Sequence, residues 1–76
     1  MTIQLMFFGQ LAEITGTGTL ELEAADTAAL QQELHARFPR LATTPYRIAV
    51  DKKMITEPVS LHPKNVVALL PPFSGG

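Results

Sequence analysis

The chain has 76 residues, of which 46 % are hydrophobic and 17 % charged, and its formal net charge is −1 at pH 7. This composition is typical of one small folded domain, and it excludes a disordered chain and leaves little room for a deep catalytic cleft. With no cysteine, the chain has no disulfide, thiolate metal site or thiol nucleophile, and its scattered Lys and Arg residues argue against a nucleic-acid partner.

The first third of the chain predicts two strands separated by a helical turn. Residues 2–8 carry apolar side chains at every second position, which is the period of a strand with one buried face. Residues 10–15 can form a short helical turn before Gly16. In residues 19–23 two leucines alternate with threonine and glutamate, which predicts a second, half-buried strand that pairs with the first in a hairpin-like unit.

One long helix is predicted over about residues 28–38. Asp26 or Thr27 is a suitable N-cap, and most of the residues that follow are strong helix formers. Pro39 is expected to end the helix, because proline has no backbone N–H to donate. Three apolar residues at helical spacing define its buried stripe: Leu30, Leu34 and Phe38.

The rest of the chain predicts three more strands around an irregular segment. Residues 46–51 indicate a third strand, and Lys52-Lys53 turns into a short fourth one, Met54-Ile55. Residues 57–65 are irregular. The continuous apolar run Val66–Leu70 is typical of a strand that is central in a sheet or buried on both faces.

The order strand, strand, helix, strand, short strand, strand predicts an α+β domain with the β-grasp fold. In this fold one main helix covers one face of a mixed sheet of four or five strands, which is the smallest way to bury these apolar stripes. We expect residues 1–72 to form the domain and residues 73–76 to form a flexible C-terminal tail that ends in Gly-Gly.

The C-terminal tail predicts an accessible carboxylate. Glycine has no Cβ, so Gly75 and Gly76 can enter a channel too narrow for a side chain. Pro71-Pro72 favours an extended backbone, and it follows the most buried strand directly, which gives the tail a rigid root. A chain without cysteine can carry sulfur only on this carboxyl, as a thiocarboxylate. The competing interpretation is a frayed terminus with no function.

A thiocarboxylate forms only after the carboxylate has been activated, and an acyl-adenylate made with ATP is the usual solution. The chain contains neither of the glycine-rich patterns that hold nucleotide phosphates, so a separate enzyme would supply that step. We therefore expect the chain to bind no cofactor, while the activating enzyme uses ATP.

Four segments carry a resemblance to one family, and the last of them is the most specific. They are Leu5-Met6-Phe7-Phe8-Gly9, Leu11–Gly16, Ala49-Val50-Asp51 and Leu69–Gly76. Over essentially its whole length the chain resembles the small subunit of molybdopterin synthase (MoaD type), a ubiquitin-like sulfur carrier. It departs from the family pattern at Asp51 and in the turn at residues 62–65, which puts partner detail in question more than the fold.

The resemblance implies a series of partners. A ubiquitin-activating-type adenylyltransferase adenylates Gly76, and a sulfur donor protein converts it to the thiocarboxylate. Phe73, Ser74 and Gly75 then enter the large subunit of molybdopterin synthase, where sulfur passes to cyclic pyranopterin monophosphate in molybdenum cofactor biosynthesis. One carrier on each large subunit of a dimer gives a heterotetramer. The catalytic acids and bases are expected in the large subunit, so this chain is a non-catalytic subunit of a sulfurtransferase.

Strand alternation also predicts a docking surface on the face of the sheet away from the helix. Met6 and Phe8 alternate with the residues that face the helix, and Leu70 and Met54 are expected on the same outward side. An exposed apolar face of this size suggests a protein partner. Phe8, Met54 and Leu70 also match positions at which the resembling family docks on the large subunit. The alternative is that a loop or the segment of residues 57–65 covers this face.

The remaining polar residues give weaker signals. His35 is expected on the solvated side of the helix, and His62 lies in a loop too far from it to suggest a metal site. Glu21 and Glu23 suit an exposed strand edge that resists aggregation better than an acid–base pair.

Other functions remain open at this stage. No apolar run is long enough to cross a membrane and no signal peptide is seen, so a cytoplasmic protein with no membrane partner is expected. The sulfur acceptor can instead belong to thiamin or cysteine synthesis. A second class of function is protein modification, in which Gly76 forms an isopeptide bond as a ubiquitin-like protein modifier. In a third class of function the chain is a plain interaction domain.

Overall fold

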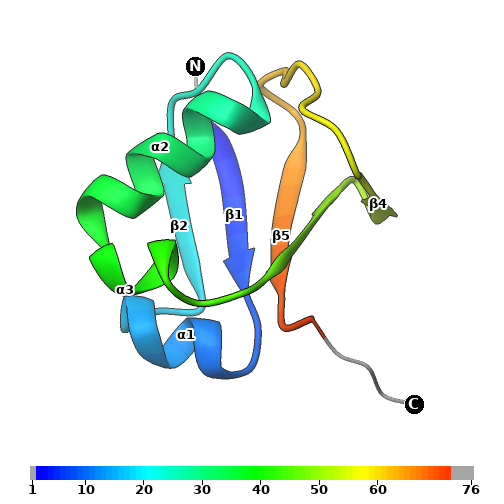
Figure 1. Cartoon of the computed structure of the whole chain (residues 1–76). Coiled ribbons are helices and arrows are strands. Elements are labelled where there is room, and N and C mark those ends of the chain that lie inside the picture. Colours follow the sequence, from blue (N-terminus) through cyan, green and yellow to red (C-terminus); the bar gives the residue numbers. More distant parts are fainter. Residues whose placement is uncertain (1, 73–76) are drawn as a thin grey trace.

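The structure is a computed structural model that describes residues 2–72, and within that range it has five strands and three helices. The strands form a single sheet, and the longest helix, α2, crosses one side of it (Figure 1). In chain order the elements are β1 (Ile3–Phe7), α1 (Gln10–Thr15), β2 (Thr19–Leu22), α2 (Thr27–Arg37), α3 (Pro39–Ala42), β3 (Arg47–Val50), β4 (Lys53–Met54) and β5 (Val66–Leu70).

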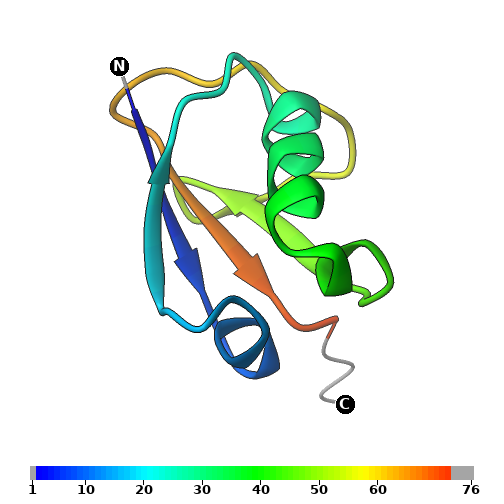
Figure 2. The same cartoon turned by 90° about the vertical axis from the view of Figure 1, so that its left-hand side faces the viewer.

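The sheet has the order β2-β1-β5-β3-β4. Its two central strands, β1 and β5, run parallel, while the other neighbouring pairs are antiparallel. Seen along its edge, the molecule consists of two layers, with the sheet on one side and α2 on the other (Figure 2). The predicted α+β class and β-grasp fold, with one main helix over a mixed five-stranded sheet, are confirmed.

The ends of the helices follow local chemistry, and one short helix was not predicted. The carboxylate of Asp26 accepts a hydrogen bond from the backbone N–H of Ala29 at 2.7 Å, so Asp26 is the N-cap of α2. The long helix ends before Pro39, as predicted, but Pro39 is also the first residue of a further short helix, α3, which was not predicted. Proline suits that position, because its missing N–H would have no partner in the first turn anyway. The resulting short helix places Leu41 in the core.

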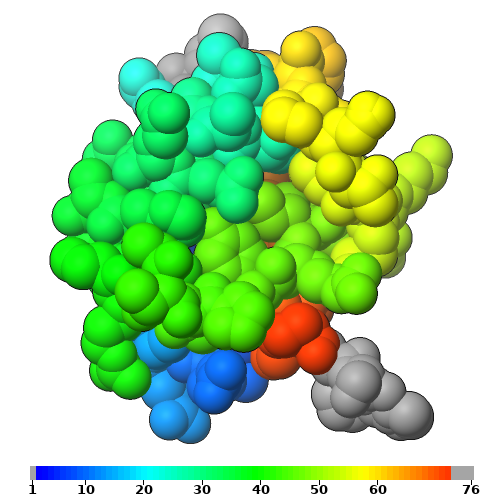
Figure 3. Space-filling model, viewed as in Figure 1, coloured from blue at the N-terminus to red at the C-terminus, as the bar shows by residue number. Residues whose placement is uncertain are grey.

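The core lies between the sheet and the helices. Leu30 and Leu34 of the predicted helical stripe are completely buried, whereas Phe38, just past the end of α2, is only partly buried. Figure 3 shows the helix side, where residues from α2 to the start of β3 cover the centre of the sheet. The buried cluster comprises Ile3, Leu5, Phe7, Leu11, Leu22, Leu30, Leu34, Leu41, Ile48, Leu61, Val67 and Leu69.

Residues 57–65 close the core at its upper end in Figure 1 and do not cover the other face of the sheet. The backbone N–H of Val59 donates to Thr27 Oγ1 at 3.0 Å, and the N–H of Thr27 donates to the Val59 carbonyl at 2.9 Å. Leu61 is buried in the core cluster. These contacts hold the segment against the start of α2, so the alternative in which it shields the outward face is wrong.

Candidate functional site

The side of the sheet opposite α2 is called the open face here, and an apolar row crosses it. Residues that are paired across neighbouring strands point to the same side of a sheet. Met6 pairs with Ala68, Ala68 pairs with Ala49, and Ala49 pairs with Met54. The row therefore runs over β1, β5, β3 and β4 without a polar interruption. Among residues 2–72, the helices lie on the other side of the sheet or at its lower edge (Figure 2).

All four residues predicted for the docking surface lie on the open face. Phe8 is 41 % exposed and Met54 is 51 % exposed, which is unusual for large apolar side chains in a small domain. Met6 and Leu70 are half-buried. The strand β5 is central, as predicted, but the alternative that it is buried on both faces is wrong. Its open-face residues are only half-buried, because the part of the chain that the structure describes lays no second layer over them.

Two shallow hollows mark the open face. One is lined by Met54, Leu70, Pro71 and Arg47, and it lies where β5 ends and the C-terminal tail begins. The other has an apolar floor and a charged rim. Its lining residues are Met6, Phe8, Asp51, Lys52, Val66 and Ala68.

Asp51 fixes the beginning of β5. Its carboxylate accepts hydrogen bonds from Asn65 Nδ2 at 2.6 Å and from the backbone N–H of Val66 at 2.9 Å. Its own N–H donates to the Val66 carbonyl at 2.9 Å. Asp51 and Lys52 both have positive φ, 50° and 72°, as expected for the two central residues of a tight hairpin turn. The turn is thus one residue earlier than predicted, and Lys53 already belongs to β4.

The corner between β1 and α1 positions the root of the tail. The backbone N–H of Phe8 donates to the Leu69 carbonyl at 3.2 Å. Gly9 has a φ of 60°, and a Cβ atom there would come within 3.0 Å of Pro71 Cγ. A glycine at this corner lets Pro71 pack closely against it. Sequence analysis missed this contact because the two residues are far apart along the chain.

The predicted tail residues Phe73, Ser74, Gly75 and Gly76 lie outside the residues that the structure describes. Their roles therefore remain predictions.

His35 is not merely a solvated surface residue, as predicted. Its Nε2 lies 2.8 Å from Tyr46 Oη, and the two rings meet edge to face. Gln31 Nε2 donates to the same hydroxyl at 3.0 Å. Burial raises the pKa of Tyr46 above its ordinary value, and the hydrogen bond from Gln31 opposes that rise. This cluster links α2 to the start of β3 and lies away from the open face.

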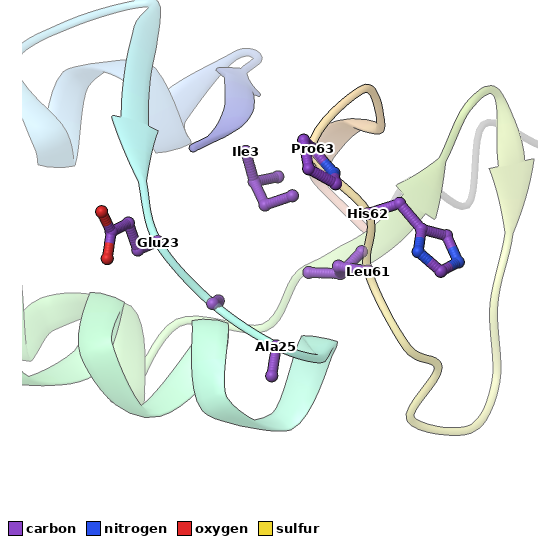
Figure 4. A pocket seen from close by; sticks show the side chains of 7 residues that line it. Ile3, Glu23, Ala25, Leu61, His62 and Pro63 are labelled. Carbon is purple, nitrogen blue, oxygen red and sulfur yellow. The ribbon is translucent and has the colours of Figure 1, made fainter. Parts of the chain in front are cut away.

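The remaining features of residues 2–72 are one more hollow and two absences. A further hollow lies between the end of β2 and the loop before β5, but Glu23 and His62 at its margins point away from it in opposite directions (Figure 4). Residues 2–72 contain no group of three or more His, Cys, Asp or Glu side chains that could hold a metal ion. No helix within the same range is long and apolar enough to span a membrane.

Comparison with known proteins decides the family. The ThiS family model matches residues 5–76, which is nearly the entire chain. The chain belongs to the ThiS family. Its likeness to the small subunit of molybdopterin synthase is therefore confirmed at the level of the ubiquitin-like sulfur carriers.

Solved structures share the fold of this ThiS-family chain. The putative molybdopterin converting factor subunit 1 from Pyrococcus furiosus is 19 % identical, with a TM-score of 0.87, over 95 % of this chain and 98 % of its own. The small archaeal modifier protein 1 from Methanosarcina acetivorans is 20 % identical, with a TM-score of 0.84, over 99 % and 96 %. A chain in the complex of subunits 1 and 2 of the molybdopterin-converting factor from Helicobacter pylori is 24 % identical, with a TM-score of 0.76, over all of both chains.

Proposed function

We propose that this ThiS-family chain is the sulfur carrier subunit of a molybdopterin synthase. The observation that carries the proposal is the apolar open face, which continues without interruption to the root of the C-terminal tail at Leu70 and Pro71. A partner that docks on this face receives the tail at a fixed position. In the Helicobacter pylori structure a protein of the same fold is in complex with subunit 2 of the molybdopterin-converting factor, which supports a large subunit as the partner.

The chemistry begins with activation of the Gly76 carboxylate. A ubiquitin-activating-type adenylyltransferase joins this carboxylate to the AMP portion of ATP and releases pyrophosphate. Sulfur at the oxidation level of sulfide, supplied by a donor protein, then displaces AMP and leaves a thiocarboxylate. In the large subunit the thiocarboxylate sulfur bonds to a carbon of cyclic pyranopterin monophosphate, and water then cleaves the bond between Gly76 and that sulfur, which returns Gly76 to a carboxylate. The carrier contributes the reacting terminus and the docking face, while the large subunit supplies acids and bases.

Intact-mass analysis tests the carrier role directly. The chain is co-expressed with its activating enzyme and sulfur donor, and we expect a mass gain equal to the exchange of one oxygen for one sulfur. Deletion of Gly76 should abolish the gain and leave the circular dichroism spectrum unchanged, since the core lies within residues 3–69. If the wild-type chain gains no sulfur under these conditions, the proposal is wrong.

Two other functions use the same activated terminus. The fold is also that of a small archaeal modifier protein, so formation of an isopeptide bond to lysine is a second candidate. Recovery of the chain covalently attached to other proteins from cell lysate would favour this modifier function. A carrier for thiamin or cysteine synthesis would form the same thiocarboxylate. It is distinguished by whether the chain, with its thiocarboxylate and the large subunit, converts cyclic pyranopterin monophosphate to molybdopterin.

A further inference from the structure

The open face carries positive charge along one margin. Arg47 is the first residue of β3, is exposed, and pairs with Leu70 on the open face. It lines the hollow at the root of the tail together with apolar residues. Lys52, at the other end of β3, is exposed on the rim of the second hollow. The two cations therefore bracket the apolar row on its β3–β4 side.

Neither cation is paired with a carboxylate in the part of the chain that the structure describes. The ion pair found among residues 2–72 joins Arg37 and Glu33 on α2, and neither Arg47 nor Lys52 takes part in one. Asp51 stands next to Lys52 but forms no ion pair with it, and its carboxylate instead accepts hydrogen bonds from Asn65 and Val66.

The opposite margin of the face has the opposite sign. There β2 presents Glu21, which is exposed and is the Cα partner of Gln4, an outward residue of β1. A partner thus meets an apolar band that is positive on one side and negative on the other. The charged residues are scattered in the sequence. The pairing of the strands places the positive ones on one margin of the open face and the negative one on the other.

We propose that Arg47 and Lys52 select a partner whose apolar docking surface carries carboxylates along the margin that meets β3 and β4. This inference rests on the proposed docking function and specifies the partner's chemistry. Docking would remove water from the hollow around Arg47, and a charge that loses water without gaining an opposite charge opposes binding. Carboxylates at this margin would both compensate the cations and fix the orientation in which the partner docks.

A small anion is a less suitable occupant than a protein surface. The two cations stand at opposite ends of β3, since Arg47 is its first residue and Lys52 lies two residues beyond its last, so they do not converge on one phosphate-sized ligand. The side chains next to Arg47 are apolar, namely those of Met54, Leu70 and Pro71, and they suit the apolar part of a protein interface. The arrangement therefore fits an extended protein surface.

Charge reversal tests the inference in the full-length chain. Binding to the molybdopterin synthase large subunit of the same organism is measured by titration calorimetry at low and high salt. Arg47→Glu and Lys52→Glu should each weaken binding about tenfold or more at low salt and reduce its dependence on salt. Arg40→Glu is the matched control, because Arg40 is exposed on α3 and makes no ion pair in residues 2–72, and it should bind like wild type.

Two further variants separate charge from packing. Arg47→Leu keeps an apolar contact but removes the charge, and equal or tighter binding would overturn the inference. The same holds if inorganic phosphate binds the wild-type chain and competes with the large subunit. Leu70→Asp should abolish docking on the open face. If Leu70→Asp loses binding while both charge-reversal variants bind normally, the charge inference fails and the docking function stands. If the wild-type chain does not bind the large subunit, the docking function fails as well.

Discussion

The two faces of the sheet are built from alternate residues of the same strands, yet they are covered very differently. In β5, Val67 and Leu69 are completely buried against the helices. Their neighbours Val66, Ala68 and Leu70 point to the open face and are half-buried. A strand repeats every two residues, so one continuous apolar run supplies both sets.

The difference in coverage assigns one face of the sheet to folding and the other to docking. A strand with apolar residues on both sides normally has both faces covered by its own chain. Here residues 2–72 cover one face, and the proposed function assigns the cover of the other to a partner protein. Substitutions on the covered face should therefore change stability, while those on the open face should change binding.

The largest effect is expected at Leu69. Its side chain is completely buried, so Leu69→Ala should lower the free energy of unfolding by about 2–5 kcal/mol through lost burial and a remaining cavity. Urea unfolding followed by circular dichroism measures the change. A loss below about 1 kcal/mol would show that the covered face is less tightly packed than the burial of Leu69 indicates.

The neighbouring Leu70 provides the matched comparison on the open face. Leu70→Ala should change the free energy of unfolding by less than about 1 kcal/mol, because the side chain is only half-buried. The same change should weaken binding to the large subunit by about 1–2 kcal/mol, because docking would bury the rest of this side chain. If Leu70→Ala unfolds the domain as readily as Leu69→Ala, the division between the two faces is wrong.

Much of the fold could be predicted from the sequence because its signals are local. The period of two in β1 and β2 and the N-cap at Asp26 each depend on residues within a few positions of one another. The end of the long helix before Pro39 was predicted correctly, but α3 was missed, because proline is compatible both with the residues after a helix and with the first turn of a new one. Local sequence does not distinguish these two cases.

The candidate site could be predicted only in part. Alternation places Met6 and Phe8 outward, and the structure agrees. The contacts of Gly9 with Pro71 and of Asp51 with Asn65 join distant parts of the chain, so no local sequence pattern predicts them. The position of Arg47 beside the root of the tail likewise follows from the pairing of β3 with β5, which the sequence does not fix.

A smaller effect is expected where the irregular segment closes the covered face. Thr27 is completely buried, and its hydroxyl accepts from the Val59 N–H. Thr27→Val keeps the shape but leaves that N–H without its partner, which should lower the free energy of unfolding by about 1–2 kcal/mol. Faster hydrogen exchange at the Val59 amide would locate the effect. The control is Thr43→Val, whose hydroxyl is exposed, and no change at Val59 in the Thr27 variant would contradict the prediction.

The smallest effect concerns the polar edge of the covered side, at Tyr46. Burial raises the pKa of this hydroxyl, although the hydrogen bond from Gln31 partly opposes the shift. In the unfolded chain the tyrosine ionises near pH 10, so above that pH the folded state retains more protons than the unfolded state. Its contribution to stability is therefore complete below pH 10 and is lost as the pH rises toward the folded-state pKa.

Tyr46 is the single tyrosine of a chain without tryptophan, so phenolate absorbance reports its ionisation directly. A titration midpoint above that of the urea-unfolded chain is expected, and Gln31→Leu should move it higher, because the opposing hydrogen bond is then gone. Tyr46→Phe should reduce the loss of stability above pH 10 relative to wild type. Leu70→Ala is the control for this titration and should leave the midpoint where it is, because Leu70 lies on the open face and Tyr46 packs against α2. If the midpoint of the Tyr46 titration moves in the Leu70 variant, the two faces of the sheet are coupled. That result would contradict the division between a folding face and a docking face.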